Sequence, residues 1–276
     1  MSSFRVFLSK RKRLLRLVQL VAHWADVFGF DWHKFVGAVR GFPIVVREYS
    51  VLKTQNEKNE SRWNLNFTMP CLADRSELSG TATGHYFHQD LLVARKIFGR
   101  QPIKHADVGS SIGSFVAHVA AFRQIEVFDI RPLTTTVPNI TFKQCDLMDL
   151  PNDFAAYCDS LSCLHALEHF GLGRYGDPLD INGHLRGFDN LHKMLQPNGI
   201  LYLSVPIGVE RIDFNAHRVF AIKTVLEWAE DHFELLGFSY VDDQGDLHEN
   251  TVLDASALSN SLGLYYGCGI FEFRKL

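Results

Sequence analysis

After Pro102 the sequence alternates between short apolar runs and helical stretches, and this alternation constrains the fold more than any other feature. Strands that alternate with helices form parallel βαβ units, with helices covering both faces of one sheet. We therefore predict an α/β domain over residues 101–276, with a doubly wound, mostly parallel sheet and an antiparallel last strand. The expected strands are 103–108, 125–130, 140–145, 160–164, 200–205, 238–241 and 269–273, and the expected helices are 115–122, 183–195 and 222–232.

The first hundred residues do not continue this pattern. Helical spacing of apolar residues predicts a helix over 4–24 and a short second helix over 32–39 that ends near Pro43. Residues 65–84 contain proline, glycine and small polar residues and are expected to be irregular, whereas 85–98 is expected to be helical. We interpret 1–60 as a basic helical N-terminal extension and 61–100 as a cap or lid segment leading into the core.

The charge of the chain is unevenly distributed. The formal net charge is only -3, which gives no polyanion-binding signature to the whole chain. The first sixteen residues carry six basic side chains and no acid, so the remainder carries -9. The basic stretch has three interpretations: peripheral contact with an anionic membrane, contact with nucleic acid, or a solvated helix packed on the core. Nucleic acid is the least favoured, because no aromatic residues are interleaved with the basic ones. The six residues are Arg5, Lys10, Arg11, Lys12, Arg13 and Arg16.

Cysteine usage and hydropathy point to a cytoplasmic protein. Five widely spaced cysteines without a Cys-x-x-Cys motif are typical of reduced thiols, not of disulfides or a cysteine-based zinc site. No run of eighteen apolar residues is present, so no transmembrane helix is expected. The apolar stretch 14–24 follows basic residues as in a signal peptide, but polar residues interrupt it and no cleavage site follows. Peripheral attachment to a membrane would depend on the basic N-terminal helix.

The loop Asp107-Val108-Gly109-Ser110-Ser111-Ile112-Gly113 joins the first strand to the next helix. Ligands of open α/β sheets bind at such turns, beyond the carboxyl ends of strands. Gly109 would permit the tight turn, and Gly113 would let helix and strand pack closely. A dinucleotide fingerprint has a middle glycine next to the pyrophosphate, where Ser111 stands here. The loop therefore favours a nucleoside without phosphates over NAD.

Two further acids follow the next two strands. Asp129 ends the second strand, with Ile130 after it, and an acid there accepts hydrogen bonds from ribose hydroxyls. Asp146 follows the third strand and is expected to meet an adenine amino group, with Leu147 against the ring. The alternative is that these acids only cap turns or helices. Three acids at three consecutive strand ends favour one adenosyl pocket.

These motifs resemble class I S-adenosylmethionine-dependent methyltransferases over roughly residues 100–275. The resemblance implies a Rossmann-like fold of that type, S-adenosylmethionine as cofactor, and methyl transfer. Two further stretches resemble a narrower family, named from Caenorhabditis proteins of unknown function, which implies no particular acceptor. Ser111 departs from the frequent glycine of the first group. The first group's motifs are Asp107-x-Gly109-x-x-x-Gly113, Asp129, Cys145-Asp146-Leu147, Ala166-Leu167-Glu168-His169 and 195–201, and the narrower family's are 84–90 and 165–177.

Two histidines and a glutamate follow the fourth strand. His165 and His169 share one face if the segment is helical, with Glu168 beside them. One hypothesis makes His169 or His165 the general base for an acceptor hydroxyl, because the ordinary pKa of histidine is about 6.5. A metal site is a second hypothesis, but no third ligand is evident by spacing, so no metal is predicted. The third is that Glu168 and His169 only hold the loop.

Six further side chains are candidates for binding the acceptor, each with a structural alternative. The glycine-rich loop after the fourth strand offers a basic and an acidic group, the region after the fifth strand offers an imidazole and a guanidinium for an anionic acceptor, and the start of the 85–98 helix offers a lid over the cofactor. In the same order these are Arg174 and Asp177, His217 and Arg218, and Tyr86 and Gln89.

The sequence thus favours a methyltransferase that acts on a small polar acceptor or a glycan, such as a sugar hydroxyl. A non-catalytic S-adenosylmethionine-binding or scaffold protein is one alternative, and a nucleotide-dependent oxidoreductase is the other. Ser111 argues against the oxidoreductase. Neither the acceptor nor the oligomeric state follows from the sequence.

Overall fold

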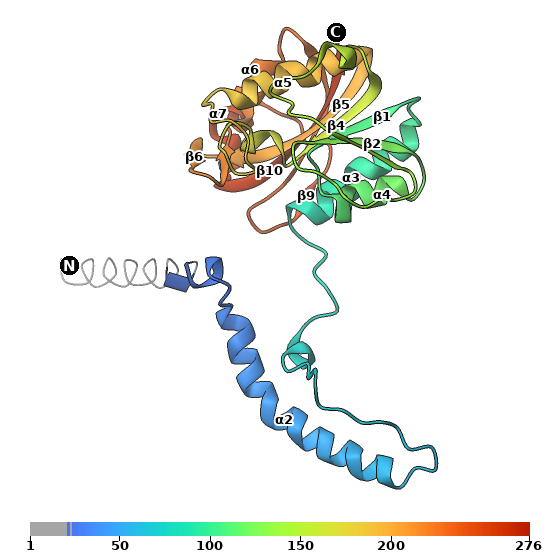
Figure 1. Ribbon diagram of the computed structural model, residues 1–276. Helices are drawn as coiled ribbons and strands as arrows, with labels where there is room; N and C mark the ends of the chain where they lie inside the picture. Colours follow the sequence, from blue (N-terminus) through green and yellow to red (C-terminus); the bar gives the residue numbers. More distant parts are fainter. Residues whose placement is uncertain (1–20, 23) are drawn as a thin grey trace, which may run out of the picture. The chain divides into compact units, whose positions relative to one another are not determined.

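The computed structural model describes residues 21, 22 and 24–276. The chain divides into two compact units, residues 1–81 and residues 82–276. Figure 1 shows the helical first unit in blue and the sheet of the second unit in green to red. Residues 21, 22 and 24, at the end of the helix predicted over 4–24, are helical, whereas the rest of that helix and its six basic residues lie outside the described residues. The three segments expected from the sequence, with bounds at 60 and 100, remain a prediction.

The first unit is built around one long helix, α2 (Trp32–Glu57), followed by irregular chain with a short 3₁₀ turn, η1 (Asp74–Ser76). The predicted end of this helix near Pro43 is wrong, because α2 continues through that residue. Proline has no backbone N–H, so one intrahelical hydrogen bond is lost at Pro43. The residues on both sides of Pro43 nevertheless remain helical. The irregular segment 65–84 is as expected.

The second unit contains an eight-stranded sheet with the order β3-β2-β1-β4-β5-β10-β8-β9. The strands β1 (His105–Val108), β2 (Ile125–Asp129), β3 (Ile140–Gln144), β4 (Cys158–Leu164) and β5 (Leu195–Gly208) are parallel to one another. The sheet order reverses at β1, so that β2 and β4 lie on opposite sides of it. Ligands of open α/β sheets bind at such a switch point, beyond the carboxyl ends of the strands.

The last strands close the sheet in the antiparallel sense. β10 (Tyr266–Lys275) lies between β5 and β8 (Phe233–Val241) and is antiparallel to both. The short β9 (Leu247–His248) pairs with β8 at the edge. The prediction of a Rossmann-like, doubly wound, mostly parallel sheet with an antiparallel last strand is therefore confirmed.

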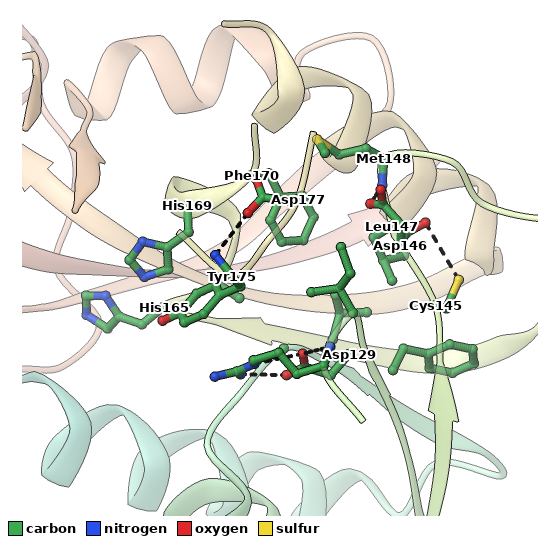
Figure 2. Close-up of a pocket in the computed structure, with 16 residues that line it drawn as sticks. Asp129, Cys145, Asp146, Leu147, Met148, His165, His169, Phe170, Tyr175 and Asp177 are labelled. Atoms are coloured by element: carbon green, nitrogen blue, oxygen red, sulfur yellow. Dashed lines mark hydrogen bonds and ion pairs between the residues drawn. The ribbon is translucent and has the colours of Figure 1, made fainter. Parts of the chain in front are cut away.

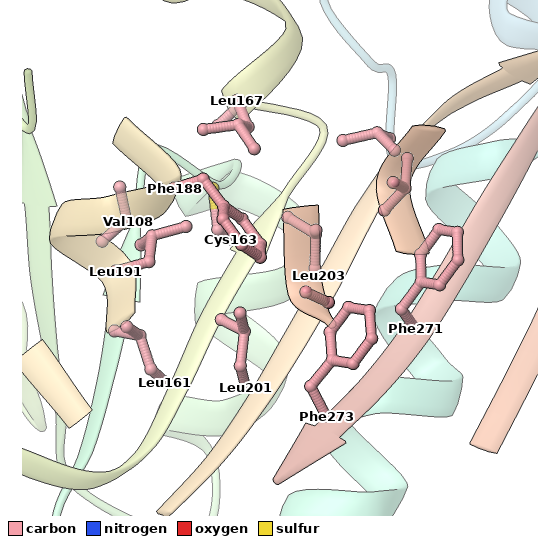
Figure 3. Close-up of a cluster of buried hydrophobic side chains, with 14 of the residues drawn as sticks. Val108, Leu161, Cys163, Leu167, Phe188, Leu191, Leu201, Leu203, Phe271 and Phe273 are labelled. Carbon is pink, nitrogen blue, oxygen red and sulfur yellow. The ribbon is translucent and has the colours of Figure 1, made fainter. Parts of the chain in front are cut away.

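Helices cover both faces of the sheet, as Figure 1 shows. One face carries α3 (His85–Arg100), η2 (Ile112–Val116) and α4 (Ala117–Ala120), and the other carries α5 (Gly183–Met194), α6 (Ile222–Ala229) and α7 (Ala255–Asn260). Alternate residues of a strand point to opposite faces. In β5, Leu201 and Leu203 pack in the cluster with Phe188 of α5, shown in Figure 3, whereas Tyr202 packs in the cluster with Val93 of α3.

Most predicted strands and helices of this unit are present within a few residues of their expected ends. The sequence patterns missed three short elements: the hairpin of β6 (Arg211–Asp213) and β7 (His217–Val219), the edge strand β9, and α7. Each is too short for a periodic pattern to mark it. Over the part of the chain that the structure describes, no helix combines the length and the apolarity needed to cross a bilayer.

Candidate functional site

Gly109 forms the turn between β1 and the first helical turn. Its φ of +69° is one that residues with a side chain rarely adopt, and a Cβ there would lie 2.9 Å from the Cβ of Ala166. The Gly109 N–H donates to the Phe128 carbonyl at 2.8 Å. This turn therefore needs glycine, as predicted.

The reason given for Gly113 is wrong. A Cβ on Gly113 would meet nothing within 4 Å, so this glycine does not serve close packing of helix and strand. It lies exposed in η2, two residues beyond Ser111, which is exposed as well. Ser110 instead is buried, and its hydroxyl accepts the N–H of Leu164 at 3.1 Å. Ser110 therefore ties the loop to β4, and Ser111 and Ile112 line the second cavity, whereas Gly113 lines neither cavity.

Asp107 is buried at the end of β1, where its carboxylate is hydrogen-bonded to Ser110 of the loop that follows β1. Its carboxylate accepts hydrogen bonds from the Ser110 hydroxyl at 2.6 Å, the Ser110 N–H at 3.1 Å and the Ser162 hydroxyl at 2.5 Å. Burial raises the pKa of Asp107 to about 6, although these hydrogen bonds oppose that shift. With its oxygens occupied by serines, Asp107 orders the loop.

Asp129 lies at the carboxyl end of β2, where a ribose-binding acid was predicted. Its side chain is 13% exposed, and both oxygens are occupied by Arg131. The Arg131 guanidinium donates to them at 3.0 and 2.7 Å, and the Arg131 N–H donates at 2.8 Å. The guanidinium also lies over the ring of Tyr175, 4.2 Å from its centre. Arg131 thus contacts both Asp129 and Tyr175, and Arg131 and Tyr175 line both cavities of the site. Neither residue is identified as a site residue by the sequence analysis.

Asp146 and Leu147 lie beyond β3, on the far side of Asp129. The Asp146 Oδ1 accepts the N–H of Met148 at 2.8 Å, which leaves its other oxygen available. Leu147 is buried, and together with Ile130 it forms an apolar wall. This combination of one carboxylate and apolar side chains suits a flat heterocycle with an amino group.

Two cavities at the carboxyl ends of the strands share part of their lining. The first, of about 50 Å³, extends from Asp146 to His169, and Figure 2 shows its lining with the two histidines at one end. The second, of about 390 Å³, runs along Ser111 and Tyr86. Both are lined by Gly109, Asp129, Arg131, His165 and Tyr175. Ligand sites usually occupy about 300–1,000 Å³, so the first cavity alone is too small, whereas both joined are large enough.

His165, Glu168 and His169 lie together at the carboxyl end of β4, although not by helical spacing. Only residues 167–169 form a 3₁₀ turn, η4, and His165 precedes it with a φ of +50°. The His165 Nδ1 lies 2.7 Å from the Glu168 Oε1, and the His169 Nε2 lies 3.7 Å from the same oxygen. All three side chains are buried, with Glu168 between the two rings.

The protonation of this group follows from its contacts. Burial opposes charge on both His165 and Glu168, but the Cys268 thiol and the Glu168 carboxylate outweigh it and raise the pKa of His165 well above its usual value. The same pairing lowers the pKa of Glu168. For His169 burial prevails, and its pKa is lowered. Because the His169 Nδ1 lies 2.6 Å from the Ala216 carbonyl, Nδ1 carries the proton and Nε2 holds a free lone pair.

Two predicted acceptor residues order the loop between η4 and α5 instead. Arg218 is buried, and its guanidinium donates to the carbonyls of Glu168, Phe170, Asp180 and Ile181 at 2.7–3.3 Å. The prediction that it faces an anionic acceptor is therefore wrong. Asp177 accepts three backbone N–H groups of the glycine-rich loop, at 2.8 to 3.2 Å, although it also lines the first cavity. Its hydrogen bonds favour the structural alternative.

The other four predicted acceptor residues are divided between the site and its surroundings. Tyr86 lines the second cavity, with its ring 5.1 Å from that of His165. Arg174 donates to the Ala216 carbonyl at 2.9 Å, beside His169. His217 lies in β7, with its ring 5.0 Å from that of Tyr266. Gln89 is buried and accepts from the Ser204 hydroxyl at 2.5 Å, so it does not reach either cavity.

One family model matches part of the chain. The model of the family described as "Caenorhabditis protein of unknown function, DUF268" matches residues 134–258, somewhat less than half of the chain. This match confirms the resemblance to that family over a segment that includes Asp146, the η4 histidines and the glycine-rich loop. No curated protein matches the chain.

Several solved structures are similar in fold at low sequence identity. The 1,6-didemethyltoxoflavin-N1-methyltransferase of Burkholderia thailandensis, with bound 1,6-didemethyltoxoflavin and S-adenosylhomocysteine, is 15% identical, with a TM-score of 0.47 over 68% of this chain and 78% of that one. The N-methyltransferase NodS of Bradyrhizobium japonicum WM9, in complex with S-adenosylhomocysteine, is 14% identical, with a TM-score of 0.46 over 82% of this chain and 97% of that one.

Proposed function

Because residues 134–258 match the DUF268 family and the sheet around them ends in an acid-lined double cavity, we propose that this chain is an S-adenosylmethionine-dependent methyltransferase. One observation carries the proposal. The two cavities share Gly109 and Asp129 in their linings, so that apolar walls with Asp146 lie on one side and the Ser111 loop lies on the other. S-adenosylmethionine supplies a methyl group on a sulfonium when it is bound.

The residues fit an adenosyl group by their chemistry. Asp129 would accept the ribose hydroxyls, and Asp146 would accept the adenine amino group with Ile130 and Leu147 against the ring. The missing Cβ of Gly109 leaves room for a ligand to approach the backbone. Of the lining side chains only Arg131 carries a fixed positive charge, and it is paired with Asp129. Ser111 stands where a dinucleotide-binding loop has the glycine next to the pyrophosphate, which favours a nucleoside ligand over NAD.

Arg131 and Tyr175 have to move for the two cavities to join. The guanidinium occupies both Asp129 oxygens that the ribose would use. Its side chain is 48% exposed, and exposed ion pairs contribute only about 0–1 kcal/mol. A ribose diol therefore competes with Arg131 at a small energetic penalty.

We propose further that the acceptor is a polar molecule with a hydroxyl group and that His169 removes its proton. The lowered pKa of His169 keeps the imidazole neutral near pH 7, and its Nδ1–H is fixed on Ala216, so Nε2 is the basic atom. Glu168 lies 3.7 Å from that nitrogen and would stabilise the imidazolium that forms. Tyr86 and Arg174 border the same end of the site and are candidates for orienting the acceptor.

Thermal unfolding of the full chain tests the cofactor assignment. A ligand at one hundred times its Kd stabilises the folded state by about 2.7 kcal/mol, which raises Tm by roughly 5–10 °C for a protein of this size. We expect such a rise with S-adenosylhomocysteine and with S-adenosylmethionine, and none with NADH at the same concentration. A rise with NADH alone would support the oxidoreductase alternative, and no rise with any of the three would contradict an adenosyl site.

A further inference from the structure

A second cluster of chemically active side chains lies behind the histidines of the candidate site. It joins His85 at the start of α3, His165 after β4 and Cys268 in β10. The ligand atoms of these three residues all lie within 4.8 Å of one another. No sequence pattern marks this cluster, because its members are separated by 80 and by more than 100 residues.

His165 is oriented as a metal ligand would be. Its Nδ1 lies 2.7 Å from the Glu168 carboxylate, so Nδ1 carries a proton. Its Nε2 is buried and has no hydrogen-bond partner in the described part of the chain, and a proton on this nitrogen would be released when a metal binds. A buried polar atom without a partner is costly unless a ligand satisfies it. Histidines that bind metals commonly donate the other ring N–H to a carboxylate, as His165 does to Glu168.

The cluster is held by rigid neighbours. The His165 N–H donates to the Ser204 carbonyl at 3.0 Å, and this contact fixes a backbone with a φ of +50°. Cys268 is fully buried in β10, and its thiol donates to Gln89 at 3.6 Å, so that the sulfur is free to face the two rings. Gln89 is in turn fixed by Ser204 at 2.5 Å. The buried Gln89, once a candidate for the acceptor, thus supports this cluster.

The third member, His85, is half-buried and packs against His165. The rings of His85 and His165 are stacked, with centres 5.1 Å apart and planes within 8°. In a tetrahedral zinc site the ligand atoms lie roughly 3.3–3.8 Å apart. The three ligand atoms would therefore have to draw closer on binding, and His85, at the first position of α3, is the least buried of the three residues.

We infer that His85, His165 and Cys268 bind a zinc ion. Imidazole and thiolate ligands select zinc over magnesium or calcium, which prefer oxygen. Three protein ligands leave the fourth position open, which is typical of zinc sites that bind water or a substrate atom. The site adjoins the second cavity, which Tyr86 and His165 line. A hydroxyl or thiol of the acceptor that takes the fourth position would lose its proton more easily.

The zinc assignment gives His165 and His169 different roles. A lone pair of His165 that binds zinc is not available to an acceptor proton, so His169 remains the candidate base. The zinc site itself does not depend on the proposed methyl transfer, since its ligands are separate from Asp129 and Asp146.

Metal binding to the full-length protein tests the inference without any cofactor or acceptor. We expect one zinc per chain by elemental analysis after purification without chelator, and a Co²⁺ titration of the metal-free protein that gives the absorption of a thiolate–cobalt bond. His85→Ala and Cys268→Ala are expected to abolish stoichiometric zinc and the cobalt–thiolate absorption. His88→Ala, one turn along α3, and Cys163→Ala, a buried cysteine in β4, serve as matched controls and are expected to bind as the parent does.

Loss of the Glu168 carboxylate provides an independent readout. Glu168→Gln keeps the shape of the side chain and is expected to weaken zinc binding by 10–100-fold, the usual effect of removing a carboxylate behind a histidine ligand. Circular dichroism checks that each variant is folded. The inference is overturned if the folded parent binds neither zinc nor cobalt at micromolar concentration, or if His85→Ala binds as tightly as His88→Ala does.

Discussion

Replacing Asp129 by alanine tests the ribose contact quantitatively. Asp129 is 13% exposed, so hydrogen bonds from two ribose hydroxyls to its carboxylate would form in a shielded site. A hydrogen bond to a charged group contributes about 1.5–3 kcal/mol. The ligand must first displace Arg131, whose pairing is worth about 0–1 kcal/mol at its exposure. This penalty reduces the net gain, and the second ribose hydrogen bond contributes less than the first. We therefore expect Asp129→Ala to weaken binding by about 1–3 kcal/mol, a factor of roughly 5–150.

Isothermal titration calorimetry with S-adenosylhomocysteine measures this difference directly. Asp149→Ala is the matched control, because Asp149 is exposed three residues beyond Asp146 and lines neither cavity. Its affinity is expected to equal that of the parent. Asp129→Asn retains one acceptor oxygen and is expected to lie between parent and alanine variant. Equal affinities of the parent and a folded Asp129→Ala would refute the ribose assignment and the reasoning from strand ends that led to it.

Four further outcomes follow from the contacts described. His169→Ala is expected to keep its affinity for S-adenosylhomocysteine and to lose turnover by 10²–10⁴-fold once an acceptor is in hand; unchanged turnover would exclude His169 as the base. Gly109→Ala is expected to lower the unfolding free energy by about 1–3 kcal/mol in urea, because of its positive φ and close neighbour, whereas Gly113→Ala is expected to be neutral; equal effects would contradict the stated roles. Arg218→Met is expected to destabilise the chain by about 2–4 kcal/mol and to expose residues 171–181 to limited proteolysis, since four carbonyls lose their donor; an unchanged cleavage pattern would argue against this clamp. The pKa of Asp107 is raised to about 6 against an ordinary value of 3.8, so the folded state holds this proton more tightly, and ionisation should lower the unfolding free energy by up to about 3 kcal/mol as pH rises from 4 to 6. Asp107→Asn should flatten that pH dependence in urea titrations, and a parallel pH profile in both proteins would disprove it.

The fold was largely predictable because burial on both faces leaves a strong pattern in a parallel sheet. Strands such as β4, buried at nearly every position, stand out as continuous apolar runs between amphipathic helices. The sequence pattern is misleading at α2, because it predicts a helix end near Pro43 and the helix continues through that residue. It also failed for β6 and β7, which are three residues each and carry no period. Sequence patterns do not predict an element correctly where the surrounding helix or the pairing with another strand determines its structure.

The candidate site was predictable only where it follows strand ends. Gly109, Asp129 and Asp146 line the first cavity together, because neighbouring parallel strands end at one edge of the sheet, whereas Asp107 is buried and lines neither cavity. Arg131 is different, since an arginine two residues past a strand gives no sign that it will pair with Asp129.

Side chains that lie far apart in the sequence were the hardest to assign. Arg218 was expected to face a ligand, yet it is turned inward by carbonyls of a loop about forty residues earlier. Cys268 was counted only as a buried thiol, and the neighbours that give it a chemical role, His85 and His165, come from two other elements. Such contacts depend on the crossing of α3, β4 and β10, which spacing along the chain does not encode.

A crystal structure of the full chain with S-adenosylhomocysteine tests the central claim most directly. The account predicts the ribose hydroxyls on Asp129 with Arg131 displaced, the adenine between Ile130 and Leu147 with its amino group at Asp146, and the homocysteine along the Ser111 loop. A ligand bound away from the carboxyl ends of β1 and β2, or bound with the Arg131–Asp129 pair intact, would contradict it.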